Sequence, residues 1–369
     1  MNQLLLKQEK ALKLTGLDYI EFYVGNSRQA LHFYQTVLGL KPIAYTGPET
    51  GCVDQVSYIL ESNQVRFVLT SALYPESSIA KCVAEHGDGV KDIAFTVEDT
   101  ANVFTEAVKR GATPIMEPTV IEDKQQQVIK ATVAAYNGVV HSFIQRSSSN
   151  SILFPQYQVL KCLPLNGAIG VTEVDHLAVC VEQNQLNKWV DFYKQVFGFH
   201  QLYQEHLNTE YSAMNSKVVQ DETCQIKLTI LEPAPGKHKS QIEEFLSYYR
   251  GAGVQHIALA SQDIVNTVQT MQSHGIEFLY VPMTYYEQLE VSLSDLDFVN
   301  IKDLQQLNIL VDQDNDGYLF QAFTKPLQNR PTLFLEIIQR VGSTSFGSRN
   351  IRALFEAIER EQAQRRNLD

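Results

Sequence analysis

Three residues that can bind a metal ion lie in three separate apolar segments of this sequence. His176 lies in VDHLAV, His256 in VQHIAL and Glu336 in LFLEII, and consecutive members are 80 residues apart. A carboxylate is costly to bury in such a segment unless a metal ion, a basic side chain or a proton meets it. Two histidines and one carboxylate are the donor set of the facial triad that binds non-haem Fe(II). The sequence therefore predicts a metal site with Fe(II) as its cofactor.

Each of these segments is expected to form a β-strand. Side chains alternate between the two faces of a strand, so each candidate ligand shares its face with residues two positions before and after it. Ligands on three strands of one curved sheet can converge on its concave side. Taken singly, each histidine is also consistent with an ordinary core residue, and Glu336 with an acid at a strand edge that faces water.

The elements that position these residues belong to an internal repeat. Residues 17–24 (LDYIEFYV) match residues 174–181 (VDHLAVCV), and residues 89–99 (GVKDIAFTVED) match residues 253–263 (GVQHIALASQD). A repeat of this length indicates a duplicated domain. We expect one domain in residues 1–150 and a second in 151–369, joined by a linker near residues 147–167 that contains serines and two prolines.

Each half is expected to contain two β-α-β-β-β modules, which gives an α+β fold of four modules with curved mixed sheets. Apolar residues follow helical spacing between Asn26, a plausible N-cap, and Gly39, and again before Gly198. Further helices are expected at residues 100–109 and 263–274. After the Gly/Ser-rich turn at 342–348, an amphipathic helix from about Arg349 should cover the metal site as a lid.

The repeat also predicts which half binds the metal. The positions of the first half that match the three ligands hold Tyr19, Asp92 and Ser142. These side chains do not form a facial triad. The first half is therefore expected to be non-catalytic, and to pack against the second half or form contacts in an oligomer.

A second group of acidic residues imitates the start of a calcium-binding loop. Asp312, Asp314 and Asp316 precede Gly317 at the spacing of an EF-hand. The twelfth position, however, holds Phe323 where such a loop needs a glutamate that binds calcium through both oxygens. A solvated acidic turn is therefore the preferred interpretation of this segment.

Composition excludes several classes of partner. The net charge of −12 and the pI near 5.3 argue against nucleic acid and against an anionic membrane surface. No apolar run approaches the roughly 18 residues of a membrane-spanning helix, and residues 1–14 lack the apolar core of a signal peptide. The five cysteines form no CxxC pair, which fits reduced thiols in a cytoplasmic protein.

The doubled module pattern resembles the vicinal-oxygen-chelate superfamily. Residues 174–361 resemble, more closely, the family of the 4-hydroxyphenylpyruvate dioxygenases and their sister enzyme 4-hydroxymandelate synthase. The matching runs include MNSKVV, KSQIEEFL, GAGVQHIA, LFQAFTKP, NRPTLFLEIIQR and SFGSRNIRALFEAIE. The resemblance implies an Fe(II) dioxygenase that takes O2 and a small-molecule substrate, 4-hydroxyphenylpyruvate, which carries its own 2-oxo acid. A homo-oligomer is expected.

The resemblance also implies which residues line the substrate pocket. The polar residues expected to act in catalysis are Ser216, Gln241, Gln255 and Gln321. The residues expected to contact the substrate are Thr229, Leu231, Phe323, Phe334, Ile351 and Leu354. Each glutamine, taken alone, is also consistent with an ordinary surface amide.

Two positions bear on the product. The dioxygenases have Asn where this chain has Leu231, and Phe where it has Ile351, whereas the synthase has a branched aliphatic residue at the first position and Ile at the second. The sequence therefore favours benzylic hydroxylation, which gives 4-hydroxymandelate and CO2. Hydroxylation of the ring with migration of the side chain, which gives homogentisate, is the alternative. A non-catalytic ligand-binding module of the same superfamily is a third interpretation.

Overall fold

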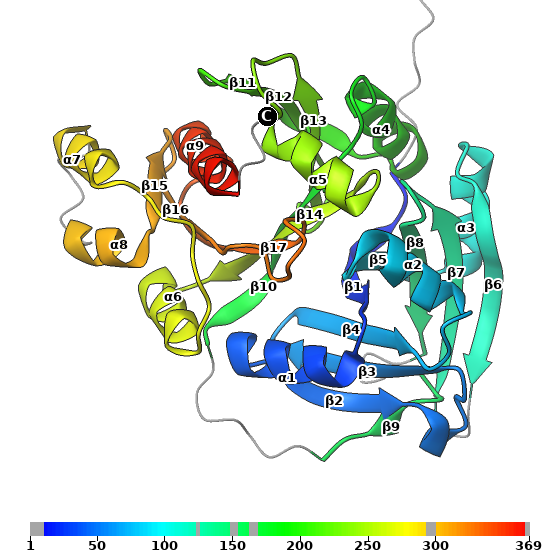
Figure 1. Ribbon diagram of the computed structural model, residues 1–369. Coiled ribbons are helices and arrows are strands. Elements are labelled where there is room, and N and C mark those ends of the chain that lie inside the picture. Colours follow the sequence, from blue (N-terminus) through cyan, green and yellow to red (C-terminus); the bar gives the residue numbers. More distant parts are fainter. Residues whose placement is uncertain (1–10, 123–125, 148–153, 162–168, 293–299, 366–369) are drawn as a thin grey trace, which may run out of the picture.

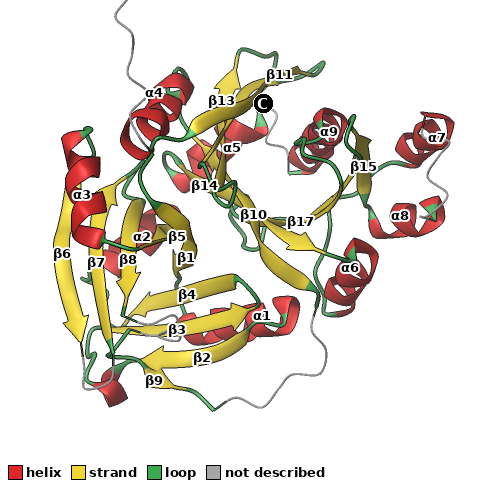
Figure 2. Ribbon diagram, turned by 180° about the vertical axis from the view of Figure 1, so that it is seen from behind, coloured by secondary structure: helices red, strands yellow, loops and turns green. Residues whose placement is uncertain are grey.

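The computed structural model describes residues 11–122, 126–147, 154–161, 169–292 and 300–365. The expectation about a signal peptide concerns mainly residues 1–10, which lie outside the described part. Of the expected linker, residues 148–153 and 162–167 also lie outside the described part. The described residues form two curled sheets with helices around them (Figures 1 and 2).

The first half forms a sheet of nine described strands in the order β6-β7-β8-β5-β1-β4-β3-β2-β9. Its elements are β1 (Leu14–Tyr23), α1 (Ser27–Leu38), β2 (Lys41–Thr46), η1 (Pro48–Thr50), β3 (Gln55–Ser62), β4 (Val65–Ala72), α2 (Ser78–His86), β5 (Gly89–Val97), α3 (Thr100–Lys109), β6 (Pro114–Glu122), β7 (Gln127–Ala134), β8 (Val140–Arg146) and β9 (Gln158–Val159). Because β9 pairs with β2, residues beyond position 150 still belong to the first sheet.

The second half forms a sheet of eight described strands in the order β11-β12-β13-β10-β14-β17-β16-β15. Its elements are β10 (Val171–Cys180), α4 (Leu186–Phe192), the π-turn η2 (Tyr193–Phe197), β11 (His200–Asn208), β12 (Ala213–Gln220), β13 (Lys227–Ala234), α5 (Gln241–Tyr249), β14 (Gly253–Ser261), α6 (Ile264–Ser273), α7 (Met283–Ser292), α8 (Ile301–Leu307), β15 (Leu310–Gln313), β16 (Tyr318–Phe323), β17 (Phe334–Val341) and α9 (Ser348–Gln364). The four modules and the α+β class are confirmed.

Local sequence signals explain where most of the expected helices begin and end. The side chain of Asn26 caps α1 by accepting hydrogen bonds from two backbone amides, and Gly39 ends this helix with φ of 63°. The matching helix α4 differs from expectation, because its last turn widens into a π-turn before Gly198. In this turn Tyr193 bonds to His141 of the first half, a tertiary contact that helical spacing does not encode.

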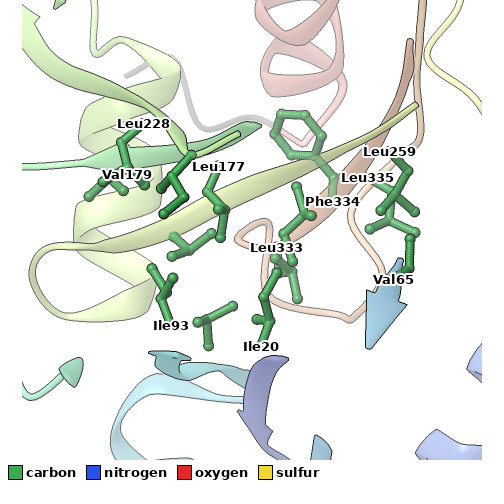
Figure 3. Packing of buried hydrophobic residues seen from close by; sticks show 14 of the residues in the cluster. Ile20, Val65, Ile93, Leu177, Val179, Leu228, Leu259, Leu333, Phe334 and Leu335 are labelled. Carbon is green, nitrogen blue, oxygen red and sulfur yellow. The ribbon is translucent and has the colours of Figure 1, made fainter. Parts of the chain in front are cut away.

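The two sheets pack back to back through one large apolar core. Leu177 and Val179 of β10 belong to this core together with Ile20 and Ile93 of the first half, and Leu259 of β14 lies on the side of Val65 (Figure 3). Because neighbouring residues on a strand face opposite sides, the residues that flank Leu177 point to the other face of the second sheet. The core thus leaves the concave face of that sheet available for a functional site, and α9 packs beside α5 near it (Figure 2). None of the described helices has the length and apolar character needed to span a membrane.

The interface between the halves contains a buried histidine. The Nε2 atom of His141 lies 2.9 Å from the hydroxyl of Tyr193, and its Nδ1 atom lies 3.2 Å from the carbonyl oxygen of Ile93. A carbonyl can only accept, so Nδ1 donates to Ile93 and Nε2 accepts from Tyr193. Burial lowers the pKa of His141 from 6.5 to about 4.

This histidine should make stability depend on pH. The unfolded chain binds a proton at His141 near pH 6.5 and the folded chain near pH 4, so stability should fall as pH drops through this range. The shift corresponds to about 3 kcal/mol. Urea unfolding at several pH values should show a smaller loss in a His141→Gln variant than in the wild type. Equal losses in both proteins would contradict this prediction.

Candidate metal centre

Three adjacent strands bring the predicted ligands together. His176 lies on β10, His256 on β14 and Glu336 on β17, and the exposed fractions of these residues are 4%, 6% and 1%. The Oε2 atom of Glu336 lies 3.4 Å from the Nε2 atom of each histidine. The three ligand atoms all lie within 4.8 Å of one another. This spacing and the donor set of two imidazoles and one carboxylate fit a single metal ion of the Fe(II) type.

The strand register explains this convergence. His176 pairs with Ala258 across β10 and β14, while Ala178 pairs with His256. On the other side of β14, Ala258 pairs with Glu336 of β17. Each ligand therefore stands beside an alanine, whose small side chain leaves space on the concave face for an ion.

The charges of the three ligands depend on one another. Burial favours neutral Glu336, but the two imidazoles outweigh burial and lower the pKa of this carboxyl to about 2. Burial also opposes a charge on His176, yet Glu336 and Asp175 outweigh it and raise the pKa of His176 to about 9. The pKa of His256 is lowered, mainly by burial. A divalent cation needs the same ionised carboxylate, and on binding it replaces the proton that His176 holds in the metal-free site.

Neighbouring side chains orient the ligands. Asp175 Oδ1 lies 2.8 Å from His176 Nδ1, so Nδ1 donates to Asp175 and Nε2 faces the other two ligands. The amide of Gln321 donates to Oε1 of Glu336 at 2.8 Å, which leaves Oε2 toward the histidines. Asn350 Nδ2 in turn donates to Oε1 of Gln321 at 2.8 Å. Such outer contacts usually tune a metal site strongly.

Asp175 and Asn350 were not predicted from the sequence. Strand alternation places Asp175 on the face opposite to His176, but the register of β10 and β14 shifts between Val174 and His176. A bulge of this kind re-aims a side chain, so two consecutive residues interact. The sequence did contain one signal for this contact: Asp175 is a polar residue directly before the predicted ligand His176. Asn350 comes from a different element, so no local pattern indicates its contact with Gln321.

A cavity adjoins the triad. Nine of the ten predicted pocket residues line it: Ser216, Gln241, Gln255, Gln321, Thr229, Leu231, Phe323, Ile351 and Leu354. The tenth, Phe334, stacks on His256 with ring centroids 4.8 Å apart and lines a neighbouring cavity. Four further lining residues were missed: Tyr203, Met214, Val218 and Phe346. Strand alternation from Ser216 identifies two of these, Met214 and Val218.

Two polar atoms of this cavity have no hydrogen-bond partner among the described residues. They are Oγ1 of Thr229 and Oε1 of Gln241, and both are buried. A buried polar atom without a partner is costly, so a bound ligand is the expected partner. Gln321, by contrast, already bonds to Glu336 and Asn350. The cavity therefore offers polar contacts mainly on the side of β13 and α5.

The C-terminal helix closes one side of the cavity with Ile351 and Leu354. The acidic segment noted in the sequence holds the start of this helix. Asp314 accepts hydrogen bonds from the Ser343 hydroxyl at 2.6 Å and from the Ser345 amide at 3.0 Å, and Asp312 accepts from the amide of Arg349 at 2.9 Å. Asp316 accepts from the Thr344 hydroxyl at 3.1 Å, so all three aspartates bond to the loop before α9 or to the first turn of the helix.

The matching site of the first half contains a lysine. Tyr19 donates to Asp92 at 3.0 Å and Ser142 donates to Asp92 at 2.6 Å. The ammonium group of Lys130 lies 3.2 Å from Asp92 and 2.8 Å from the Tyr19 hydroxyl. The strand register places Lys130 where the second half has Gln321. The ammonium group therefore supplies the positive charge that a metal ion would supply in the second half.

Comparisons with known proteins match both halves and the whole chain. Residues 18–129 and 173–322 each match a model described as the Glyoxalase/Bleomycin resistance protein/Dioxygenase superfamily. The chain is 40% identical to 4-hydroxyphenylpyruvate dioxygenase of Yarrowia lipolytica and of Xenopus tropicalis, in both cases over 96% of this chain and 93% of the relative. A solved structure of a triple mutant of 4-hydroxymandelate synthase from Streptomyces coelicolor is 35% identical, with a TM-score of 0.83, and the match covers 95% of this chain and 99% of that one.

Loss of a ligand should abolish metal binding. We expect His176→Ala, His256→Ala and Glu336→Ala each to weaken metal affinity by at least about 100-fold, more than a typical loss of an outer contact. Each should also abolish turnover while the circular dichroism spectrum stays unchanged. Near-normal oxygen uptake by any of the three variants, with iron supplied, would contradict the assignment.

The first half should bind no metal. Metal analysis should give one ion per wild-type chain and the same value in a Ser142→Ala variant. Two ions per chain would contradict this expectation.

Lys130 should matter for stability alone. A Lys130→Met variant leaves Asp92 buried without its cation, and loss of one partner of a buried pair costs about 3 kcal/mol. Urea unfolding should show this loss, while metal content stays at the wild-type value. Lys109→Met, which breaks an exposed pair with Glu106, is the matched control and should change stability little. Similar losses in both variants would refute the role assigned to Lys130.

Proposed function

Because this chain belongs to the 4-hydroxyphenylpyruvate dioxygenase family and has the buried triad of a non-haem iron dioxygenase, we propose that it converts 4-hydroxyphenylpyruvate and O2 to homogentisate and CO2. The observation that carries this proposal is the triad itself, which opens onto a cavity with polar and aromatic walls. Homogentisate is preferred because full-length relatives at 38–41% identity are named as dioxygenases of this type.

His176, His256 and Glu336 would hold Fe(II), and bound Fe(II) would supply the redox chemistry that activates O2. The other residues of the cavity bind and orient the substrate. The oxygen atoms of Thr229 and Gln241 are suited to meet polar groups of the substrate, because both lack partners among the described side chains. Phe323 and Leu354 supply apolar contact for the aromatic ring and keep water away from it.

A second candidate product rests on the cavity walls. Leu231 and Ile351 both line the cavity, and the family resemblance connects these residue types with 4-hydroxymandelate. A tenfold change in the ratio of two products requires only about 1.4 kcal/mol between the two barriers. The residue types at positions 231 and 351 favour 4-hydroxymandelate, whereas the names of the full-length relatives favour the alternative, homogentisate. We therefore place homogentisate first and 4-hydroxymandelate second.

The third interpretation, a non-catalytic ligand-binding module, has less support. A binding module does not need three buried metal ligands with outer hydrogen bonds that leave their metal-facing atoms available. The expected homo-oligomer and the cytoplasmic location stay predictions.

Product analysis tests the proposal directly. We expect purified protein with Fe(II), ascorbate, air and 4-hydroxyphenylpyruvate to consume oxygen and to form mainly homogentisate, identified by chromatography and mass spectrometry. A boiled sample and the Glu336→Ala variant are the controls. Mainly 4-hydroxymandelate would replace the first candidate by the second, and no oxygen uptake that depends on substrate would favour a binding module.

The two cavity positions should control the product ratio. Ile351→Phe adds ring contact and Leu231→Asn adds a polar group, so the double variant should form about tenfold less 4-hydroxymandelate relative to homogentisate than the wild type. The single variants should fall between these limits. The same chromatographic separation measures both products, and a ratio unchanged within twofold would show that these residues do not set it.

A further inference from the structure

An arginine outside the substrate cavity connects two parts of the metal centre. The guanidinium group of Arg340, on β17, binds both carboxylate oxygens of Asp175, with Nε–Oδ2 at 2.8 Å and Nη2–Oδ1 at 3.0 Å. Asp175 is 8% exposed, and its Oδ1 atom also accepts the proton of His176 Nδ1 at 2.8 Å. A two-pronged contact of this kind holds a carboxylate in one orientation. Arg340 therefore acts on His176 through Asp175.

The same arginine also holds the loop before α9. Its Nη1 atom donates to the carbonyl oxygen of Ser345, and its guanidinium lies 5.3 Å from the ring centroid of Phe346. The Phe346 ring lines the cavity and meets the His176 ring edge-on at 5.4 Å. Arg340 thus contacts both Asp175, which bonds to Nδ1 of His176, and Phe346, whose ring packs against the ring of His176.

The repeat contains a second copy of this arrangement. Arg146 binds both oxygens of Asp18, with Nε–Oδ2 at 3.0 Å and Nη2–Oδ1 at 2.6 Å, and its guanidinium lies 5.4 Å from the ring centroid of Phe154. Phe154 meets Tyr19 edge-on at 5.9 Å, as Phe346 meets His176. This copy lies beside the site that contains Lys130. The arrangement of arginine, aspartate and phenylalanine therefore also occurs where no histidine ligand is present.

We propose that Arg340 is a positioning residue of the metal centre. Through Asp175 it holds His176 in the tautomer and orientation that direct Nε2 to the metal, and through Phe346 it holds the wall beside that ligand. Arg146 performs only the structural part of this role, because Asp18 precedes a tyrosine instead of a histidine. This inference rests on the proposed iron centre and goes beyond it, because it assigns a task to a residue that lies outside the substrate cavity.

The two copies supply a matched experiment in the full-length protein. Arg340→Met and Arg146→Met each remove the two-pronged contact, so both should lower the melting temperature of the metal-free protein. Only Arg340→Met should weaken the binding of Co²⁺, by about 10–100-fold as for other outer contacts of metal sites. Competition with a chelator measures this affinity. The visible Co²⁺ absorption of Arg340→Met should also change. Arg340→Lys should restore part of the affinity, because a lysine keeps the charge but not the planar fork.

Two further variants cover the case in which the arginine variants do not fold. Asp175→Asn and Asp18→Asn keep the size of the side chain but remove its charge, and only the first should weaken Co²⁺ binding. Wild-type affinity and absorption in Arg340→Met or Asp175→Asn would overturn the proposal, as would equal weakening by the two members of either pair. A wild-type protein that binds neither Co²⁺ nor Fe²⁺ would overturn the iron centre as well, so the two failures are distinguishable.

Discussion

The ionised carboxylate of Glu336 is the constraint around which the second half is built. An ionised carboxylate with 1% exposure is costly unless positive charge and hydrogen bonds surround it. Two imidazoles approach one of its oxygens at 3.4 Å, and Gln321 donates to the other. The strand register that aligns alanines beside the ligands makes this arrangement sterically feasible. The metal centre therefore arises because β10, β14 and β17 are neighbours and their ligand side chains converge on one point.

The two halves solve the same electrostatic problem in different ways. In the first half the buried acid is Asp92, and the ammonium group of Lys130 lies 3.2 Å from it. A lysine carries its charge on its own side chain, so this half needs no ion and offers no open coordination position. In the second half Gln321 stands at the corresponding place and is neutral, so the positive charge must come from the histidines or from a metal ion. The closed structural site and the site that can do chemistry thus differ at the three ligand positions and at the position of Lys130 and Gln321.

The sequence predicts those parts of the fold and of the site that depend on a regular spacing of residues or on the internal repeat. Alternation along strands and the 80-residue spacing identify the triad, and the repeat indicates the four modules. The sequence does not predict the parts that depend on an irregularity such as a β-bulge, or on contacts between elements that are distant in the chain. Asp175 reaches His176 because of a bulge, and Asn350 reaches Gln321 from another element. The cavity walls at Met214 follow alternation and were predictable, whereas Phe346 lies in a loop without a pattern.

The outer contacts also separate the cavity into a constrained part and a variable part. Gln321 and Phe346 are tied to the metal ligands, by a hydrogen bond to Glu336 and by ring contact with His176 respectively, so a change at either position disturbs the metal centre. Leu231 and Ile351 have apolar side chains, which cannot form hydrogen bonds to the metal ligands, and they pack in one apolar cluster. These positions can change the shape of the cavity while the metal centre stays intact. This separation lets residues that place a substrate vary while the residues that hold the metal stay constant.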